Sequence, residues 1–270
     1  MTAMKPPPQR NHWEDMARKW ARVKPPLRPN AEVAEAVRAE LALLDGPTLL
    51  LGVTPELATI AAPLIGIDRN PGMIACAWPG NGGGRSAVQG DWLAMPVAGT
   101  SIANAIGDGS FNTLAYPAGY VRLFDELAHV LKPGGRIVVR NFTTPETGEA
   151  LAAVREAVLA RRIVSLHAFK WHLAMAVVAH AGSPNIRVTR IRDAFHEIFP
   201  DPAGLRAATG WTADEIDTIE VYKDSIVSFS FPTLSEFRRV IPAGFAAVRV
   251  LPSGSYEMAD RCPIIVMDRV

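Results

Sequence analysis

Short apolar runs alternate with amphipathic segments along the first half of the chain. Leu49, Leu50 and Leu51 form one continuous apolar run, which is typical of a parallel strand that is buried on both faces. Between residues 120 and 131, apolar side chains recur at spacings of three and four, which indicates an amphipathic helix. Because strands and helices alternate, the pattern predicts an α/β fold with a parallel sheet. The strands that we predict in this half are residues 49–51, 64–68, 86–91, 101–112 and 137–139.

A glycine corner follows the first predicted strand. Gly52 permits a tight reversal of the chain, and Thr54 and Pro55 are the residue types preferred at the N-cap and at the first position of a helix. A helix that begins there would direct its free N–H groups at the carboxyl edge of the sheet, where open α/β sheets bind their ligands. The pattern therefore predicts a nucleotide crevice at this corner.

Acidic residues end the next three predicted strands. Asp68 ends the second strand, where a carboxylate can accept hydrogen bonds from both hydroxyls of a ribose. Asp91 ends the third strand, and Trp92 follows it with an aromatic face available near a purine. The fourth strand runs into small polar residues around Asp108. This spacing suits an adenosine cofactor.

Three runs of the sequence resemble the class I S-adenosylmethionine-dependent methyltransferases. They are GIDRNPGMI at residues 66–74, GDWLAMPV at residues 90–97 and LFDELAHVLKPGGRIVV at residues 123–139. The resemblance implies a Rossmann-like, seven-stranded, mostly parallel sheet whose last strand is antiparallel. Two strand-like runs in the tail, residues 245–251 and 263–268, fit the last pair of that sheet.

The resemblance also implies S-adenosyl-L-methionine as the cofactor and a role for each residue that contacts it. Asp68, with Arg69 beside it, would hold the ribose hydroxyls, and Asp91 would hold the adenine amino group with Trp92 beside the ring. The implied cofactor-binding residues are completed by Gly52 and Thr54, which would border the methionine moiety, and by Asp108, which would lie near the cofactor's amino group or the acceptor.

The glycine corner departs from the family pattern. Family members usually carry an acid two residues before the first glycine and further glycines after it. This chain has Leu50 at the first position and Val-Thr-Pro-Glu at residues 53–56. Side chains in this loop would keep the backbone further from the methionine end of the cofactor than a glycine loop does. We therefore interpret the first motif as altered, and weak or lost cofactor binding stays an alternative.

The chain divides into an arm, a core and an insertion. We predict an N-terminal arm with a short helix at residues 1–30, a methyltransferase core at residues 31–142 and 245–270, and a helical cap insertion at residues 143–244, between the fifth and sixth strands. Because the insertion leaves and re-enters the sheet at the cofactor edge, we expect it to shape the acceptor pocket. Its predicted helices are residues 147–163, 165–181 and 188–199, followed by capping-box starts at Thr212 with Glu215 and at Thr233 with Glu236.

The N-terminal arm places apolar side chains on one face of its predicted helix. Trp13, Met16, Ala17 and Trp20 share that face at spacings of three and four, and the face needs a surface to cover. It could pack on the body of the domain, on a second subunit in a homodimer, or over the cofactor as a lid. Asn30 then caps a helix whose Val33, Val37, Leu41 and Leu44 we expect to face the sheet.

Composition and charge exclude several classes of protein. The net charge of +1 argues against a nucleic-acid-binding protein, although seven Lys or Arg against two acids give residues 1–28 a net charge of +5. Cys76 and Cys262 lie far apart, without metal-ligand or disulfide spacing, so no bound metal is expected. We find no long apolar run that could span a bilayer and no secretory leader, and therefore expect no membrane partner and a cytoplasmic location.

No side chain is predicted to be catalytic. In-line methyl transfer from a sulfonium depends on holding the nucleophile close to the methyl carbon, and orientation of this kind can contribute roughly 7–11 kcal/mol. His167 and His172 lie in a segment predicted to be a buried helix and could each take a proton from an acceptor. A hydrogen-bonded core or interface histidine is the more common role for each, and the catalytic residue stays unassigned.

Three functions agree with this sequence. The leading prediction is an S-adenosylmethionine-dependent methyltransferase that acts on a small molecule, because a helical cap without a strongly basic channel favours a small acceptor. A non-catalytic partner or regulatory protein with the same fold is favoured by the altered glycine corner. A nicotinamide-dependent oxidoreductase is the third function, because such enzymes also bind their cofactor with a strand, a turn and a later acidic residue. The G-x-G-x-x-G signature of those enzymes is absent at Gly52.

Overall fold

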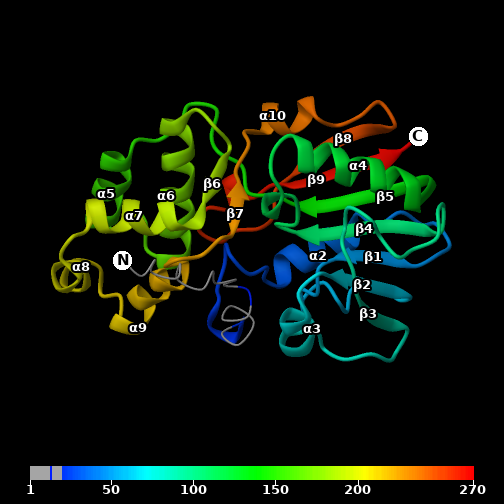
Figure 1. Ribbon diagram of the computed structural model, residues 1–270, viewed down its shortest axis with the longest axis horizontal. Coiled ribbons are helices and arrows are strands. Elements are labelled where there is room, and N and C mark those ends of the chain that lie inside the picture. Colours follow the sequence, from blue (N-terminus) through cyan, green and yellow to red (C-terminus); the bar gives the residue numbers. More distant parts are fainter. Residues whose placement is uncertain (1–12, 14–19) are drawn as a thin grey trace, which may run out of the picture.

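A seven-stranded sheet forms the centre of the protein, and a group of helices lies beyond the carboxyl ends of its parallel strands (Figure 1). The computed structural model describes residue 13 and residues 20–270. The strands run in the order β3-β2-β1-β4-β5-β9-β8. Strand β9 is antiparallel to both of its neighbours and the other neighbouring pairs are parallel, as predicted. The strands are β1 (Thr48–Leu51), β2 (Leu64–Asp68), β3 (Arg85–Gln89), β4 (Ile102–Asp108), β5 (Leu131–Arg140), β8 (Phe245–Leu251) and β9 (Ile264–Arg269).

Alternate side chains of each central strand enter different layers of the core. In β1, Leu49 and Leu51 belong to the cluster that includes α4 (Ala118–Val130) and α10 (Leu234–Arg239), whereas Leu50 belongs to the cluster that includes α2 (Ala31–Ala39). All three leucines are buried, as expected of a parallel strand covered on both faces. The sheet therefore lies between two helical layers.

Helix α4 follows the predicted pattern and α2 follows it only in part. Every apolar residue predicted for the buried face of α4 is buried. Asn30 caps α2 by accepting a hydrogen bond from the backbone N–H of Val33 (3.1 Å), but α2 ends at Ala39 and Leu44 is exposed, so this part of the prediction is wrong. Beyond the end of the helix, the N–H of Ala42 donates to the side chain of Asn104 on β4 (2.8 Å).

The predicted helix after the glycine corner does not form. The N–H groups of Leu57 and Ala58 donate to the carbonyl of Thr54 (3.1 and 3.0 Å), which makes a turn rather than a regular helix. Pro63 immediately precedes β2, and a residue that precedes proline disfavours the α conformation. Pro63 therefore limits the length of any helix that starts at Pro55.

The segment between β5 and β8 is mostly helical, as predicted. Ser165 caps α6, and both predicted capping boxes are present, at the starts of α9 and α10. Two features were not predicted: α8 and a pair of short antiparallel strands, β6 and β7. The elements of this segment that precede α10 are α5 (Leu151–Leu159), α6 (Leu166–Ala181), β6 (Asn185–Arg187), α7 (Val188–Ile198), α8 (Pro202–Thr209), α9 (Ala213–Ile216), the 3-10 helix η3 (Asp217–Tyr222) and β7 (Ser228–Ser230).

Helices α5 to α9 lie beyond the carboxyl ends of β4 and β5, toward which the arrows of these strands point (Figure 1). Helix α6 is buried on nearly every side, because it is apolar all round. Within residues 20–270 and Trp13, no helix combines the length and the apolar character needed to cross a membrane. The carboxyl ends of the parallel strands therefore face the insertion, and a pocket lies between them.

Candidate functional site

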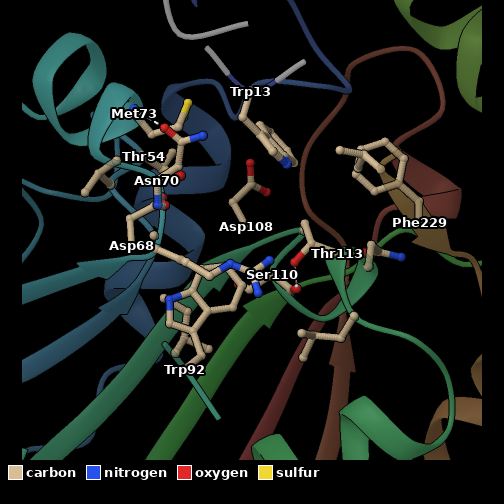
Figure 2. A pocket seen from close by; sticks show the side chains of 18 of the residues that line it. Trp13, Thr54, Asp68, Asn70, Met73, Trp92, Asp108, Ser110, Thr113 and Phe229 are labelled. Carbon is tan, nitrogen blue, oxygen red and sulfur yellow. Dashed lines mark hydrogen bonds between the residues drawn. The ribbon is translucent and has the colours of Figure 1, made fainter. Parts of the chain in front are cut away.

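A cavity of about 630 Å³ lies at the carboxyl ends of the parallel strands. Residues at or just after the carboxyl ends of β1, β2, β3 and β4 form the side of the cavity next to the sheet, which we call the core side. Figure 2 shows Thr54, Asp68 and Asn70 on one side of the pocket and Phe229 on the other, with Trp13 between them. All seven residues predicted from the sequence to contact the cofactor line this one cavity: Gly52, Thr54, Asp68, Arg69, Asp91, Trp92 and Asp108.

Gly52 makes the corner between β1 and the cavity. Its φ of 110° lies in the region that favours glycine, and its N–H donates to the carbonyl of Ile67 on β2 (2.8 Å). A Cβ atom at this position would lie 3.8 Å from Oδ2 of Asp68 and 3.7 Å from the ring of Trp92. The glycine therefore keeps the space between these two side chains free.

Asp68 presents a partly buried carboxylate at the end of β2. Its Oδ1 accepts a hydrogen bond from the backbone N–H of Asn70 (2.8 Å), which fixes the side chain beside the start of α3 (Pro71–Ala77). Burial raises the pKa of Asp68 from 3.8 to about 6, and the Asn70 N–H only partly opposes that rise. A buried carboxylate with a raised pKa is stabilised in its charged form by further hydrogen-bond donors, which the hydroxyls of a ribose can supply.

The raised pKa of Asp68 predicts pH-dependent binding of an adenosyl ligand. An ionised carboxylate at this position would accept two ribose hydroxyls, whereas the protonated form has lost one acceptor. Since the pKa is about 6, lowering the pH from about 7 to about 5 should raise the dissociation constant of S-adenosylhomocysteine by about tenfold, as expected for one proton. Calorimetric titration across this range measures the effect. Asp68→Asn is the matched control, and an equal slope in that variant would assign the pH dependence to another group.

Asp91 and Trp92 lie at the rim next to Asp68. The indole N–H of Trp92 donates to the carbonyl of Ile67 (2.6 Å), so the ring orientation is fixed by β2. Oδ1 of Asp91 accepts a hydrogen bond from the N–H of Leu93 (2.9 Å), which holds an exposed carboxylate in a tight turn. The ring of Trp92 and the carboxylate of Asp91 therefore border the same part of the cavity as Asp68.

Asp108 is paired with an arginine that the sequence did not single out. Nε of Arg140 donates to Oδ1 of Asp108 (2.5 Å) and Nη2 donates to Oδ2 (3.0 Å), and the two side chains are 0% and 4% exposed. The two residues are register partners at the ends of β4 and β5. Their position at the ends of adjacent strands is the signal that could have predicted the pair.

Arg140 also holds two segments that are distant in the sequence. Its Nη2 donates to the carbonyl of Pro26 in the arm (2.8 Å) and its Nη1 donates to the hydroxyl of Tyr256 in the tail (2.7 Å). The guanidinium lies over the rings of Phe142 and Tyr256. Arg140 thereby joins the floor of the cavity to the arm.

The described residues of the N-terminal arm lie against the cavity. Trp13, Trp20, Val23 and Leu27 line it. Met16 and Ala17, which were predicted to share a helical face with the two tryptophans, lie outside the described residues. After the lining residues, Arg28 forms an ion pair with Glu56 in the turn beyond Gly52 (2.5 Å).

Neither histidine considered for catalysis lines the cavity. Burial lowers the pKa of His167 to about 4, and Nδ1 of His172 contacts Glu149 (3.0 Å). Within the part of the chain that the structure describes, no group of three His, Cys, Asp or Glu side chains could hold a metal ion.

Solved structures share this architecture over almost the whole chain. A methyltransferase from Thermotoga maritima has a TM-score of 0.53 at 15% identity and covers 96% of this chain and 99% of its own. A Haloferax volcanii protein, solved in complex with the Trm112 methyltransferase activator, has a TM-score of 0.54 at 12% identity (95% and 93% covered). A proposed Zn-dependent alcohol dehydrogenase from Rhodobacter sphaeroides has a TM-score of 0.56 at 9% identity (96% and 96% covered). At these identities the likeness shows the fold, and the chain has the class I S-adenosylmethionine-dependent methyltransferase fold.

Sequence relatives carry methyltransferase names. The chain is 31% identical over 163 residues to a demethylmenaquinone methyltransferase from Mycobacterium sp. (strain KMS), which covers 59% of this chain and 62% of the relative. It is 38% identical over 93 residues to a demethylmenaquinone methyltransferase from Corynebacterium glutamicum (strain R), covering 34% and 37%. The chain therefore spans less than two thirds of the length of the curated relatives that it matches. No family model matches the chain.

Proposed function

We propose that this protein is an S-adenosylmethionine-dependent methyltransferase that acts on a small-molecule acceptor. One observation carries the proposal: a single cavity at the carboxyl edge of a methyltransferase-type sheet is lined by every residue that the sequence predicted for the cofactor. Its volume of about 630 Å³ lies within the range of about 300–1,000 Å³ typical of ligand pockets.

The residues present fit an adenosyl group. Asp68 would accept the ribose hydroxyls, which supply the donors that its buried carboxylate needs. Asp91 and Trp92 would hold the adenine, and the corner at Gly52 and Thr54 would border the methionine moiety. When bound, the cofactor supplies a methyl group on a sulfonium that is already a good leaving group, so the protein has to orient the acceptor and exclude water.

A small acceptor is supported by the cavity and by the sequence relatives. The insertion and the arm both line the cavity, so side chains of this chain border the space beyond the cofactor. The demethylmenaquinone methyltransferases, which are similar over part of this chain, have names that specify a small-molecule acceptor. Their acceptor is not assigned to this protein. The insertion lines the far side of the cavity, so its side chains would decide which acceptor fits.

A non-catalytic protein of the same fold is the second candidate. It is favoured by the irregular turn that replaces the predicted helix after Gly52, because a regular helix N-terminus would offer more free N–H groups to the carboxylate of the cofactor. This candidate predicts that the cavity does not bind the cofactor.

Titration calorimetry with S-adenosylmethionine, S-adenosylhomocysteine and NAD tests the proposal. We expect both adenosyl ligands to bind with micromolar or tighter dissociation constants and NAD to bind at least about tenfold more weakly. Binding of NAD alone would instead indicate an oxidoreductase. If neither adenosyl ligand bound, the proposal would be wrong and the non-catalytic candidate would be favoured.

A further inference from the structure

The cavity has two sides of different chemistry. The core side carries Asp68, Arg69, Asp91 and Asp108, which are all ionisable. The far side is formed after β5 and by the insertion, and its described lining residues carry no ionisable group other than one phenol. They are Phe142, Trp171, Tyr222, Ile226, Val227, Ser228 and Phe229.

Three rings on the far side form what we call the aromatic wall: Phe142, Trp171 and Phe229. The ring centroids of Trp171 and Phe142 lie 5.4 Å apart, and those of Trp171 and Phe229 lie 5.5 Å apart, both in edge-to-face contact. Trp13 from the arm contacts Phe229 in the same geometry, at 6.0 Å. Figure 2 shows the ring of Trp13 between Phe229 and the cofactor side of the cavity. The aromatic wall and Trp13 thus form one continuous apolar surface.

The aromatic wall is held in place by the core of the protein. Ser230, next to Phe229 on β7, donates its hydroxyl to the carbonyl of Leu114 (2.8 Å) and contacts the hydroxyl of Tyr120 (2.9 Å). The side-chain amide of Asn112 donates to the carbonyl of Ser230 (2.7 Å). Because the bonds to Tyr120 and Asn112 are buried, they hold β7 and Phe229 in place before a ligand binds, and a wall held in place reduces the entropy that binding has to overcome.

Asn112 and Thr113 near the wall are already used, whereas the indole N–H of Trp171 and the hydroxyl of Ser110 are buried without a hydrogen-bond partner among the described residues. Asn112 donates to the carbonyls of Phe142 (2.8 Å) and Ser230, and its oxygen accepts the N–H of Phe142 (2.9 Å). The hydroxyl of Thr113 donates to the carbonyl of Ser110 (2.8 Å). A charged acceptor placed against the aromatic wall would lose its hydration and find there only one unpaired donor, the indole N–H of Trp171, which a neutral oxygen on a ring can use at a much lower desolvation cost.

We propose that the aromatic wall is the acceptor subsite and that it selects a flat, uncharged, largely apolar ring system; this inference rests on the methyltransferase function proposed above. The ring packs against Trp171 and Phe229, with Trp13 covering it, and its nucleophilic atom points toward the side of Asp68 and Asp108. Phe229 and Trp171 are then specificity-determining residues. Flat rings gain apolar burial and ring-edge contacts on such a wall, whereas saturated or charged molecules gain less.

Two probes of equal ring size test the inference. Calorimetry measures the binding of 2-naphthol, which is neutral near neutral pH, and of 2-naphthoate, which carries a carboxylate on the same rings. Each is titrated into the full chain with and without saturating S-adenosylhomocysteine. We expect 2-naphthol to bind at least about tenfold more tightly than 2-naphthoate.

Variants then assign the binding to the wall. Phe229→Ala should weaken the binding of 2-naphthol by about tenfold or more and leave the dissociation constant of S-adenosylhomocysteine within about twofold. Phe229→Leu, which keeps apolar volume but removes the ring, should show an intermediate loss. Val164→Ala, at an exposed position of the insertion outside the cavity, is the matched control and should change neither.

The outcomes separate the two proposals. If 2-naphthoate bound as tightly as 2-naphthol, or if Phe229→Ala left the binding of 2-naphthol unchanged, the acceptor inference would be overturned while the cofactor site stood. If 2-naphthol bound at Phe229 but S-adenosylhomocysteine did not bind, the methyltransferase function would be overturned and the aromatic subsite would stand. Binding of neither compound would overturn both.

Discussion

Replacing Arg140 with methionine is expected to lower the free energy of unfolding by about 3–5 kcal/mol, because it leaves a buried carboxylate without its partner. Arg140 is fully buried and donates two hydrogen bonds to Asp108, whose side chain is 4% exposed. The substitution also removes the bonds to Pro26 and Tyr256. Chemical denaturation of the ligand-free protein, followed by fluorescence or circular dichroism, measures the change.

Two control variants separate the ion pair from the other contacts of Arg140. Tyr256→Phe removes only one hydroxyl and should cost about 0.5–1.5 kcal/mol. Replacing both partners, Asp108→Leu with Arg140→Met, should recover most of the loss, because no unpaired charge remains. A loss below about 1 kcal/mol in Arg140→Met would mean that water reaches Asp108 and that the pair is not buried in solution.

The ion pair also links the cavity to the N-terminal arm. Arg140 contacts Asp108 in the floor of the cavity and the carbonyl of Pro26 in the segment that leads to Trp20 and Trp13. Disrupting it should therefore loosen the cover of the cavity as well as the fold. The same residue thus serves stability and the shape of the site.

The elements that the sequence predicted well are those with a strong local pattern. The apolar stripe of α4 places five residues in the core, and the capping boxes of α9 and α10 depend only on residues three positions apart. Every predicted cofactor residue ends a strand or follows one, and the parallel sheet brings these strand ends together. This part of the site therefore follows from strand order alone.

The features that the sequence did not predict depend on distant contacts. Strands β6 and β7 are three residues each, too short to carry a periodic pattern, and they form because Ser230 and Asn185 bond to the core near Leu114 and Tyr116. The pairing of Arg140 with Asp108 requires the register of β4 with β5. The aromatic wall requires the insertion to fold back over the sheet edge, which no local pattern specifies.

Replacing Asp68 with alanine is expected to weaken the binding of S-adenosylhomocysteine by on the order of 100-fold, because two charge-assisted hydrogen bonds to the ribose are lost, each worth about 1.5–3 kcal/mol. The carboxylate borders the glycine corner, since a Cβ atom on Gly52 would lie 3.8 Å from its Oδ2. Solvent does not replace the lost acceptor fully, since Asp68 is partly buried. Calorimetric titration at about neutral pH measures the loss.

Asp68→Asn distinguishes a lost contact from a damaged fold. Its amide oxygen can still accept the N–H of Asn70, so the turn into α3 should persist, while the paired ribose contact is lost. Because burial raises the pKa of Asp68 to about 6, the ionised carboxylate destabilises the folded state, and this cost grows as the pH rises from about 4 through 6. The asparagine variant should therefore be at least as stable as the wild type at neutral pH and still bind the ligand weakly. Unchanged affinity in both variants would show that Asp68 does not contact the ribose, and the placement of the adenosyl group beside β2 would have to be abandoned.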